Sequence, residues 1–141
     1  MKDGALADIK VLEIGQMVSA PYCAKLFADY GADVVKIEPL GGDVARGWGP
    51  FPADVPHPEK SGLFFFLNTN KQSVALDIAS ARGKELLLEL VAKADVVSEN
   101  HLPPRARALG IDYVSLAARN PNLVVVSITP FGQTGPYADW N

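Results

Sequence analysis

The sequence predicts an α/β fold in which helices flank a Rossmann-like parallel sheet. Five short runs are rich in Val and Ile, and the last of them shows little strict alternation of apolar and polar residues. This pattern is typical of strands buried on both faces of a sheet. Helical patterns separate most of these runs. A strand–helix–strand repeat favours right-handed parallel units, and therefore a doubly wound sheet.

The expected elements follow one another in a regular order. Strands are expected at residues 10–14, 33–38, 73–78, 95–99 and 123–129. Helices are expected at residues 20–30, 80–94, 104–109 and 112–119. Gly31 and Gly110 suit the left-handed position that follows a helix, and Ser80 is a candidate N-cap. Apolar residues at helical spacing mark the buried faces of the first two helices, namely Cys23, Leu26, Phe27, Tyr30, Leu86, Leu87, Leu90 and Val91.

Composition and charge narrow the class of protein. The 141 residues suffice for one domain, which we place over residues 1–141. Hydrophobic residues at 48% and charged residues at 21% are near the globular average, which excludes a disordered tail or a coiled coil. The net charge of -3, without a basic run, argues against a nucleic-acid partner. The single cysteine, Cys23, excludes an intramolecular disulfide and fits a cytoplasmic protein.

Targeting and metal signals are also missing from the sequence. Residues 1–15 lack the continuous apolar stretch of a signal peptide. No window of about 18 apolar residues is present, so we expect no membrane span. His57 and His101 lie far apart, and Cys23 shares no zinc-ligand spacing with them. We therefore expect no metal site.

Two segments interrupt the alternation of strands and helices. Residues 39–62 are rich in Gly and Pro and are too long for an ordinary connection. Such segments are usually functional or contact a partner. Residues 130–141 (PFGQTGPYADWN) have a loop composition, and no crossover helix follows the last expected strand. We therefore expect the chain to be a piece of a longer protein.

The carboxyl ends of the expected strands indicate where a ligand would bind, because ligands of open parallel sheets lie beyond these ends. The segments there are rich in small residues, amides and Gly, at residues 15–21, 39–43, 79–83, 100–105 and 130–136. Free N–H groups at nearby helix N-termini favour a ligand that carries phosphate. Neither a G-x-G-x-x-G fingerprint nor a P-loop motif is present, which argues against dinucleotide or P-loop binding.

Five segments, in order, resemble the class III CoA-transferase family, which includes formyl-CoA transferase. They lie at residues 6–50, 68–78, 83–100, 109–124 and 127–136. The succession of GADVVKIE, GD-x-x-R and FGQTGP is the most specific part of this resemblance. The α-methylacyl-CoA racemases belong to the same superfamily, and this region does not separate the two activities.

The resemblance implies a CoA-binding N-terminal portion, an acyl-CoA and a carboxylic acid as substrates, no prosthetic group, and an interlocked homodimer. It assigns CoA contacts to Val18, Ser19, Leu76, Asp77, Ile78, Ala79, Asn100, His101, Leu102 and Thr129. A basic residue is common in the helix after Asn100, and Arg105 and Arg107 are the candidates, since Ala108 occupies the formyl-CoA transferase position. Lys71 is a further candidate for a CoA phosphate, with a solvated turn as its alternative interpretation.

The catalytic group of this family is an aspartate that attacks the acyl-CoA thioester. By resemblance, it would lie a few residues beyond FGQTGP in a G-x-D context. Asp139 is near this place but lies in Y-A-D-W, so we assign no catalytic residue to the chain. Two alternatives to a CoA-transferase stay open. They are an acyl-CoA racemase on the same scaffold, and a non-catalytic CoA-binding fragment.

Several other residues allow two interpretations each. Cys23 fits a buried small hydrophobe better than a nucleophile. Arg46 could contact a phosphate or a partner subunit, or form a surface ion pair. Glu38 could bind a ribose hydroxyl or be a charge at a strand end. For the aromatic residues we favour packing against the sheet or a second chain over a ligand platform, at Trp48, Phe51, Phe64, Phe65 and Phe66.

Overall fold

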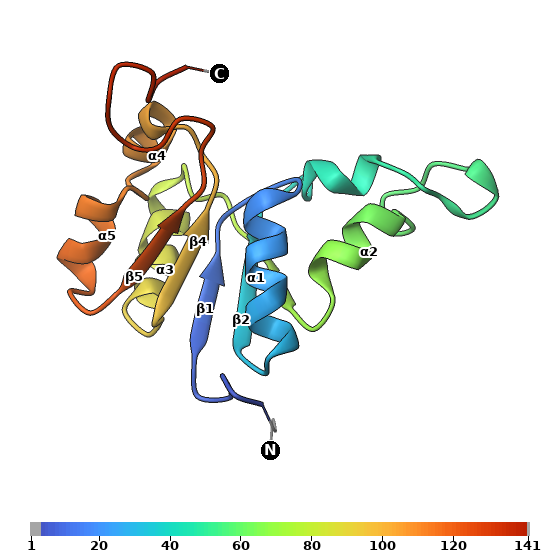
Figure 1. The fold of residues 1–141 in the computed structure, drawn as a ribbon, viewed down its shortest axis with the longest axis horizontal. Coiled ribbons are helices and arrows are strands. Elements are labelled where there is room, and N and C mark those ends of the chain that lie inside the picture. The colour runs from blue at the N-terminus through green and yellow to red at the C-terminus, as the bar shows by residue number, and fades with distance from the viewer. Residues whose placement is uncertain (1–3, 141) are drawn as a thin grey trace.

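The computed structural model describes residues 4–140, so the first three residues and the last residue of the predicted domain lie outside it. Within this range, five parallel strands form one sheet in the order β3-β2-β1-β4-β5 (Figure 1). The strands are β1 (Lys10–Glu13), β2 (Asp33–Glu38), β3 (Gln72–Ala75), β4 (Val96–Glu99) and β5 (Val124–Ser127). The predicted α/β class with a parallel sheet is confirmed.

Helices connect the strands of the described range. The α-helices are α1 (Ser19–Asp29), α2 (Gly62–Asn68), α3 (Ala81–Val91), α4 (Pro103–Leu109) and α5 (Tyr113–Arg119). Two short 3-10 helices, η1 (Val44–Gly47) and η2 (Pro52–Asp54), lie between β2 and α2. The sequence predicts four of the α-helices near their observed bounds and misses α2. Its N-cap, Ser61, accepts a hydrogen bond from Phe64 N, and this local signal was available in the sequence.

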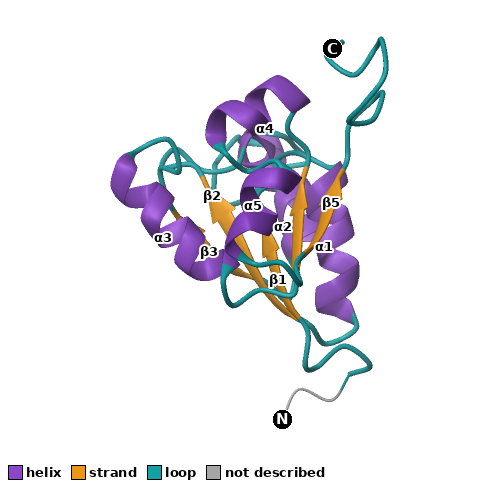
Figure 2. Cartoon of the chain, turned by 90° about the vertical axis from the view of Figure 1, so that its left-hand side faces the viewer, coloured by secondary structure: helices purple, strands orange, loops and turns teal. Residues whose placement is uncertain are grey.

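Helices cover both faces of the sheet, because successive side chains of a strand point to opposite faces. Figure 2 shows α1 and α3 on opposite sides of the strands. On one face, Val11 and Val34 pack in a cluster with Ala24 of α1. On the other face, Leu12 packs in a cluster with Leu87 of α3 and residues of α4 and α5. The central strands are therefore enclosed between two helical layers.

The expectation that every strand is buried on both faces is wrong for the strands at the two edges. All four residues of β3 are exposed, and Val124 of β5 is 57% exposed. An edge strand has a neighbour on one side alone, so helices that pack on the sheet centre shield it less. The expected strand at residues 73–78 is also too long, because its pairing with β2 ends at Ala75. Leu76 and the residues after it form the turn that leads into α3.

The long segment at residues 39–62 is ordered and extends to one side of the sheet together with α2 (Figure 1). Asp43 caps η1 by accepting a hydrogen bond from Ala45 N at 2.8 Å. The Ser61 hydroxyl is within hydrogen-bond distance of two carbonyl oxygens, Ala45 O at 2.7 Å and Trp48 O at 2.5 Å. These contacts tie the segment to the start of α2.

Candidate functional site

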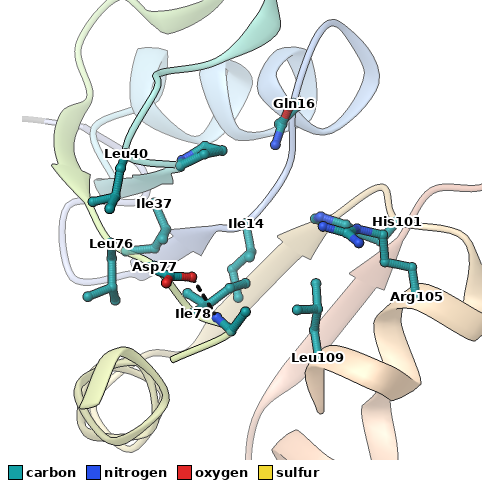
Figure 3. A pocket seen from close by; sticks show the side chains of 12 residues that line it. Ile14, Gln16, Ile37, Leu40, Leu76, Asp77, Ile78, His101, Arg105 and Leu109 are labelled. Carbon is teal, nitrogen blue, oxygen red and sulfur yellow. Dashed lines mark hydrogen bonds between the residues drawn. The ribbon is translucent and has the colours of Figure 1, made fainter. Parts of the chain in front are cut away.

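The strand order reverses between β1 and β4, since β2 follows β1 on one side and β4 lies on the other. In open parallel sheets, ligands bind in the crevice beyond the carboxyl ends of the strands at this point. A cavity of about 260 Å³ opens there. Ile14 and Gln16 reach it from β1, Ile37 from β2 and His101 from the loop after β4 (Figure 3). The topology of the sheet therefore places the candidate site.

The cavity lies between two walls of different chemistry (Figure 3). The turn before α3 supplies one wall, with Leu76, Asp77, Ile78 and Ala79. The loop after β4 and helix α4 supply the other, with His101, Arg105 and Leu109. The first wall is stiffened where Ala79 N donates a hydrogen bond to Asp77 Oδ1 at 3.1 Å. The first wall is apolar apart from the Asp77 carboxylate, and it faces a guanidinium and an imidazole. This arrangement suits a ligand with an apolar body and a negative charge.

A second hollow of about 430 Å³ adjoins this cavity. It shares Gln16, His101 and Arg105 with the cavity and is also lined by Met17, Asn100 and Leu102. The two hollows therefore form one extended site along the carboxyl ends of β1 and β4. Such a shape can hold an elongated ligand with several chemically distinct parts.

Asn100 holds the loop between β1 and α1, which borders both hollows. Gln16 N donates a hydrogen bond to Asn100 Oδ1 at 3.0 Å. Asn100 Nδ2 donates to Gln16 O at 2.8 Å and to Ser19 Oγ at 3.0 Å. The Asn100 amide is therefore a support for this loop as well as part of the wall of the second hollow.

A buried ionic group, made of Glu13, Lys36, Asp43 and Lys71, also supports this loop. All four side chains are at most 1% exposed. Lys36 Nζ lies 2.6 Å from Glu13 Oε1 and 2.7 Å from Asp43 Oδ2, and Lys71 Nζ lies 2.7 Å from Glu13 Oε2. Two positive charges therefore balance two negative charges. Buried charges are tolerated when they are paired and hydrogen-bonded in this way.

Lys71 has no donor left for a ligand in this conformation. Its ammonium, which carries three donors, donates to Glu13 Oε2, to Pro21 O at 2.7 Å and to Asn68 Oδ1 at 2.9 Å. Burial lowers the pKa of Lys71, and the negative charge of Glu13 opposes this shift. The interpretation of Lys71 as a solvated turn residue is therefore wrong for its ammonium. Lys71 also lines neither hollow.

The carboxyl end of β2 carries a second ion pair. Arg46 donates through Nε to Glu38 Oε2 at 2.8 Å and through Nη2 to Oε1 at 2.9 Å, and its guanidinium lies 3.8 Å from the Phe64 ring centre. Ser73 Oγ and Asp43 N also donate to this carboxylate. Burial raises the pKa of Glu38, but the hydrogen bonds outweigh it and hold the pKa at about 2. These four bonds fill the acceptor sites that a ribose hydroxyl would need.

His101 is placed by the strand that precedes it. Its backbone N–H donates to Oε2 of the fully buried Glu99 at 2.7 Å, and its Nδ1 lies 3.7 Å from the same oxygen. This turn puts the imidazole in the wall shared by both hollows. His101 therefore forms part of the wall of the candidate site.

The structure brings together most of the residues assigned to CoA by resemblance. Those that line the extended site are Leu76, Asp77, Ile78, Ala79, Asn100, His101 and Leu102. Of the two basic candidates, Arg105 also lines it and Arg107 does not. Val18 and Ser19 lie at the start of α1, where Val18 is 46% exposed and Ser19 is bound by Asn100. Thr129 follows β5, and its buried Oγ1 has no hydrogen-bond partner among residues 4–140. Neither Val18, Ser19 nor Thr129 lines the two hollows.

The structure also places Asp139 and three of the aromatic residues for which two interpretations were open. Asp139 is exposed and lies 3.4 Å from Arg107 Nη2, so it forms a surface ion pair. Trp48, Phe65 and Phe66 are 58–59% exposed, so they do not pack against the sheet within the described chain. Phe66 stacks on Tyr22 of α1 at 6.4 Å between ring centres.

The strand-end rule indicated Gln16, Pro39 and Leu40, which lie in the segments 15–21 and 39–43 and line the cavity. Sequence reasoning missed Ile14, Ile37 and Leu109, which also line it. The remaining positions depend on which face of an element points to the cavity. That information comes from the register of the sheet and the packing of α4.

The family model for CoA-transferase family III matches residues 6–141. The chain belongs to CoA-transferase family III. This family III chain is 41% identical over 138 residues to a succinate–glutarate CoA-transferase of Agrobacterium fabrum, covering 96% of the chain and 34% of that relative. It is 40% identical over 136 residues to a formyl-CoA:oxalate CoA-transferase of Bradyrhizobium sp., covering 96% of the chain and 31% of that relative.

Solved structures agree with the fold of this family III chain. A CAIB/BAIF family protein from Brucella suis superposes with a TM-score of 0.87 at 38% identity, covering 97% of the chain and 36% of that protein. The chain thus spans about a third of the length of the curated relatives and solved structures it matches. None of the helices within residues 4–140 has the length and apolar content that a membrane crossing requires.

Proposed function

We propose that this chain is the N-terminal CoA-binding domain, residues 1–141, of an acyl-CoA:carboxylate CoA-transferase. The observation that carries the proposal is the extended site at the strand-order reversal. Seven residues to which the family resemblance assigns CoA contacts, and the candidate Arg105, line its two hollows, although they come from separate parts of the chain. In this proposal the site holds CoA as a substrate, without a prosthetic group, and the protein is a cytoplasmic, interlocked homodimer.

The proposed reaction passes through acyl transfer to an aspartate carboxylate. The carboxylate attacks the acyl-CoA thioester carbonyl, the CoA thiolate leaves, and a mixed anhydride forms. The thiolate then attacks the aspartyl carbonyl and releases the first acid as its carboxylate, which leaves an aspartyl-CoA thioester. The acceptor carboxylate attacks this thioester, which expels the CoA thiolate and forms a second mixed anhydride. The thiolate finally attacks the acceptor's acyl carbon and displaces the aspartate carboxylate. The new acyl-CoA leaves, and the aspartate is free again.

We infer that the nucleophilic aspartate of this reaction lies outside the described residues. Asp139 is the nearest candidate after the FGQTGP loop, but it lacks the G-x-D context and is paired with Arg107 on the surface. The role of residues 4–140 in the proposal is therefore to hold CoA. The names of the relatives point to dicarboxylic acids such as succinate and glutarate as the first acceptors to test, together with oxalate.

The first prediction concerns Arg105. Titration calorimetry of the chain with CoA should give a binding isotherm, and Arg105→Ala should weaken the affinity by roughly 10-fold, because it removes a cation that can pair with a phosphate. Arg119→Ala is the matched control, since Arg119 lies at the end of α5 and lines neither hollow. Equal affinities of the two variants would contradict the assignment of Arg105.

Assays of the whole protein separate the alternatives. Incubation of the whole protein with succinyl-CoA and glutarate or oxalate should form a new acyl-CoA, measured by mass spectrometry. Exchange of the α-proton of a 2-methylacyl-CoA in deuterated water, without a new acyl partner, would instead select the racemase. CoA binding without either reaction would select the non-catalytic interpretation. Absence of CoA binding to the wild-type protein would overturn the proposal itself.

A further inference from the structure

The backbone of Met17 is the starting point of a further inference. Met17 has a φ of 66°, which lies in the left-handed region that residues other than glycine rarely adopt. It stands in the loop between β1 and α1 and lines the second hollow beside Gln16. An unfavourable conformation of this kind persists when neighbouring groups hold it in place.

Asp43 is the group that holds Met17 from the side of β2. Met17 N donates a hydrogen bond to Asp43 Oδ1 at 3.0 Å. The other oxygen of this carboxylate lies 2.7 Å from Lys36 Nζ, and Lys36 Nζ also donates to Gly15 O at 3.0 Å. Gly15, which precedes the left-handed turn, and Met17 itself are therefore attached to the same buried ion pair.

Asn100 completes the support from the side of β4, through its hydrogen bonds to both backbone groups of Gln16. The left-handed turn is thus held from two strand ends at once. Asp43 differs from Asn100 in one respect that matters for a test. The Asp43 side chain is fully buried and lines neither hollow, so it cannot contact a ligand there directly.

We propose that Asp43 is a positioning residue for CoA, which acts by keeping Met17 in its left-handed conformation and so keeping Gln16 and Met17 in the wall of the site. This inference rests on the proposed function. Without the hydrogen bond from Met17 N, the loop populates right-handed conformations in which this wall is lost. The apparent affinity for CoA becomes the intrinsic affinity multiplied by the fraction of molecules that keep the competent loop.

The test compares glycine and alanine at position 17 in the absence of the Asp43 carboxylate. Asp43→Ala should weaken CoA binding by roughly 5- to 30-fold, the range that a left-handed non-glycine residue implies. Adding Met17→Gly should recover most of this loss, because glycine adopts positive φ without strain. Adding Met17→Ala should not recover it, although it also removes the methionine side chain.

A second readout separates positioning from general stability. Urea unfolding should show that the variant with Asp43→Ala and Met17→Gly stays less stable than wild type, since Lys36 keeps Glu13 but still lacks the Asp43 carboxylate. Its CoA affinity should nevertheless recover. If Asp43→Ala does not fold, Asp43→Asn takes its place. Asparagine keeps an acceptor for Met17 N and loses the ion pair, so it should lower stability with less than a 3-fold effect on affinity.

The outcomes distinguish this inference from the proposed function. If glycine and alanine at position 17 give equal CoA affinity in the Asp43→Ala background, the positioning role is overturned while CoA binding stands. A large loss of affinity in Asp43→Asn, equal to its loss of stability, would also overturn it. If the wild-type chain does not bind CoA, the proposed function fails first.

Discussion

At the scale of single residues, the charged side chains of the strand ends are used mainly inside the protein. Glu13 accepts from Lys36 and Lys71, and Glu38 accepts from Arg46. These pairs join the end of β1 to β2 and to the residue before β3, and the end of β2 to η1. Removing one partner of such a buried pair leaves an unpaired charge in a poorly solvated place, which is strongly destabilising. Charges near a ligand site can therefore serve its geometry rather than touch the ligand.

The pKa of Glu38 gives a pH-dependent prediction. The folded protein holds this pKa at about 2, below the ordinary value of 4.5. A depressed pKa contributes stability that is full above the ordinary value and is lost as the pH falls towards the folded value. Glu38→Gln should therefore be less stable than wild type at pH 6, and the difference in free energy of unfolding should shrink between about pH 4.5 and pH 2.

Urea unfolding at a series of pH values measures this difference. Glu59→Gln is the control, since the Glu59 side chain is 70% exposed and its contact with Arg46 is solvent-screened. A difference between wild type and Glu38→Gln that stays constant from pH 6 to pH 3 would show that the ion pair does not carry this dependence.

At the scale of elements, the contact between α3 and the turn before it shapes one wall of the site. Gly83 in the first turn of α3 is buried, and a Cβ placed on it would lie 1.8 Å from Asp77 O. Backbone at this distance must move before a side chain fits. The same turn carries Leu76 and Ala79 into the cavity wall. Close approach of a helix to a turn is thus part of how the site is built.

Gly83→Ala should therefore lower both stability and CoA affinity. We expect a loss of about 1–3 kcal/mol in the free energy of unfolding, as for other overpacked positions. We also expect weaker CoA binding, because the displaced turn belongs to the site. Gly47→Ala is the control, since nothing lies within 4 Å of its added Cβ, and it should change stability by less than about 0.5 kcal/mol. Wild-type affinity in Gly83→Ala would contradict the proposed wall.

At the scale of the whole molecule, one helical face stays uncovered in the described chain. Tyr22 and Leu26 of α1 and Phe65 and Phe66 of α2 are 43–59% exposed, and α1 contacts α2. Contiguous exposed apolar surface of this kind marks a contact surface for protein. This face is consistent with the proposed dimer and with a chain that spans about a third of its relatives.

We expect the chain to self-associate through this face. Sedimentation velocity should show association that rises with concentration, and the pair of changes Leu26→Glu and Phe65→Glu should reduce it. Val114→Glu is the control, because Val114 is 75% exposed on α5, which packs on the other face of the sheet. A wild-type chain that stays monomeric up to high concentration would contradict this prediction.

The sequence alone determined the features that depend on local pattern. Runs of β-branched residues located the five strands, because this preference acts within a few residues. Local caps were also readable, since Ser80 accepts from Gly83 N and Gly110 adopts a left-handed φ of 60° after α4. The loops that follow the strands could be assigned to one edge of the sheet, because the carboxyl ends of parallel strands all lie at that edge.

The tertiary structure alone decided which polar groups meet. Lys71 and Glu13 are 58 positions apart, and Asn100 and Gln16 are 84 apart, so no local pattern pairs them. Strand order and register bring these groups together. Burial then decides their roles. The Lys71 ammonium is a candidate for binding a phosphate, but it is buried and pairs with Glu13, because a buried ammonium requires partners. Most residues that line the site take no part in these buried ion pairs. Asn100 has two roles, since it lines the second hollow and also supports the loop after β1.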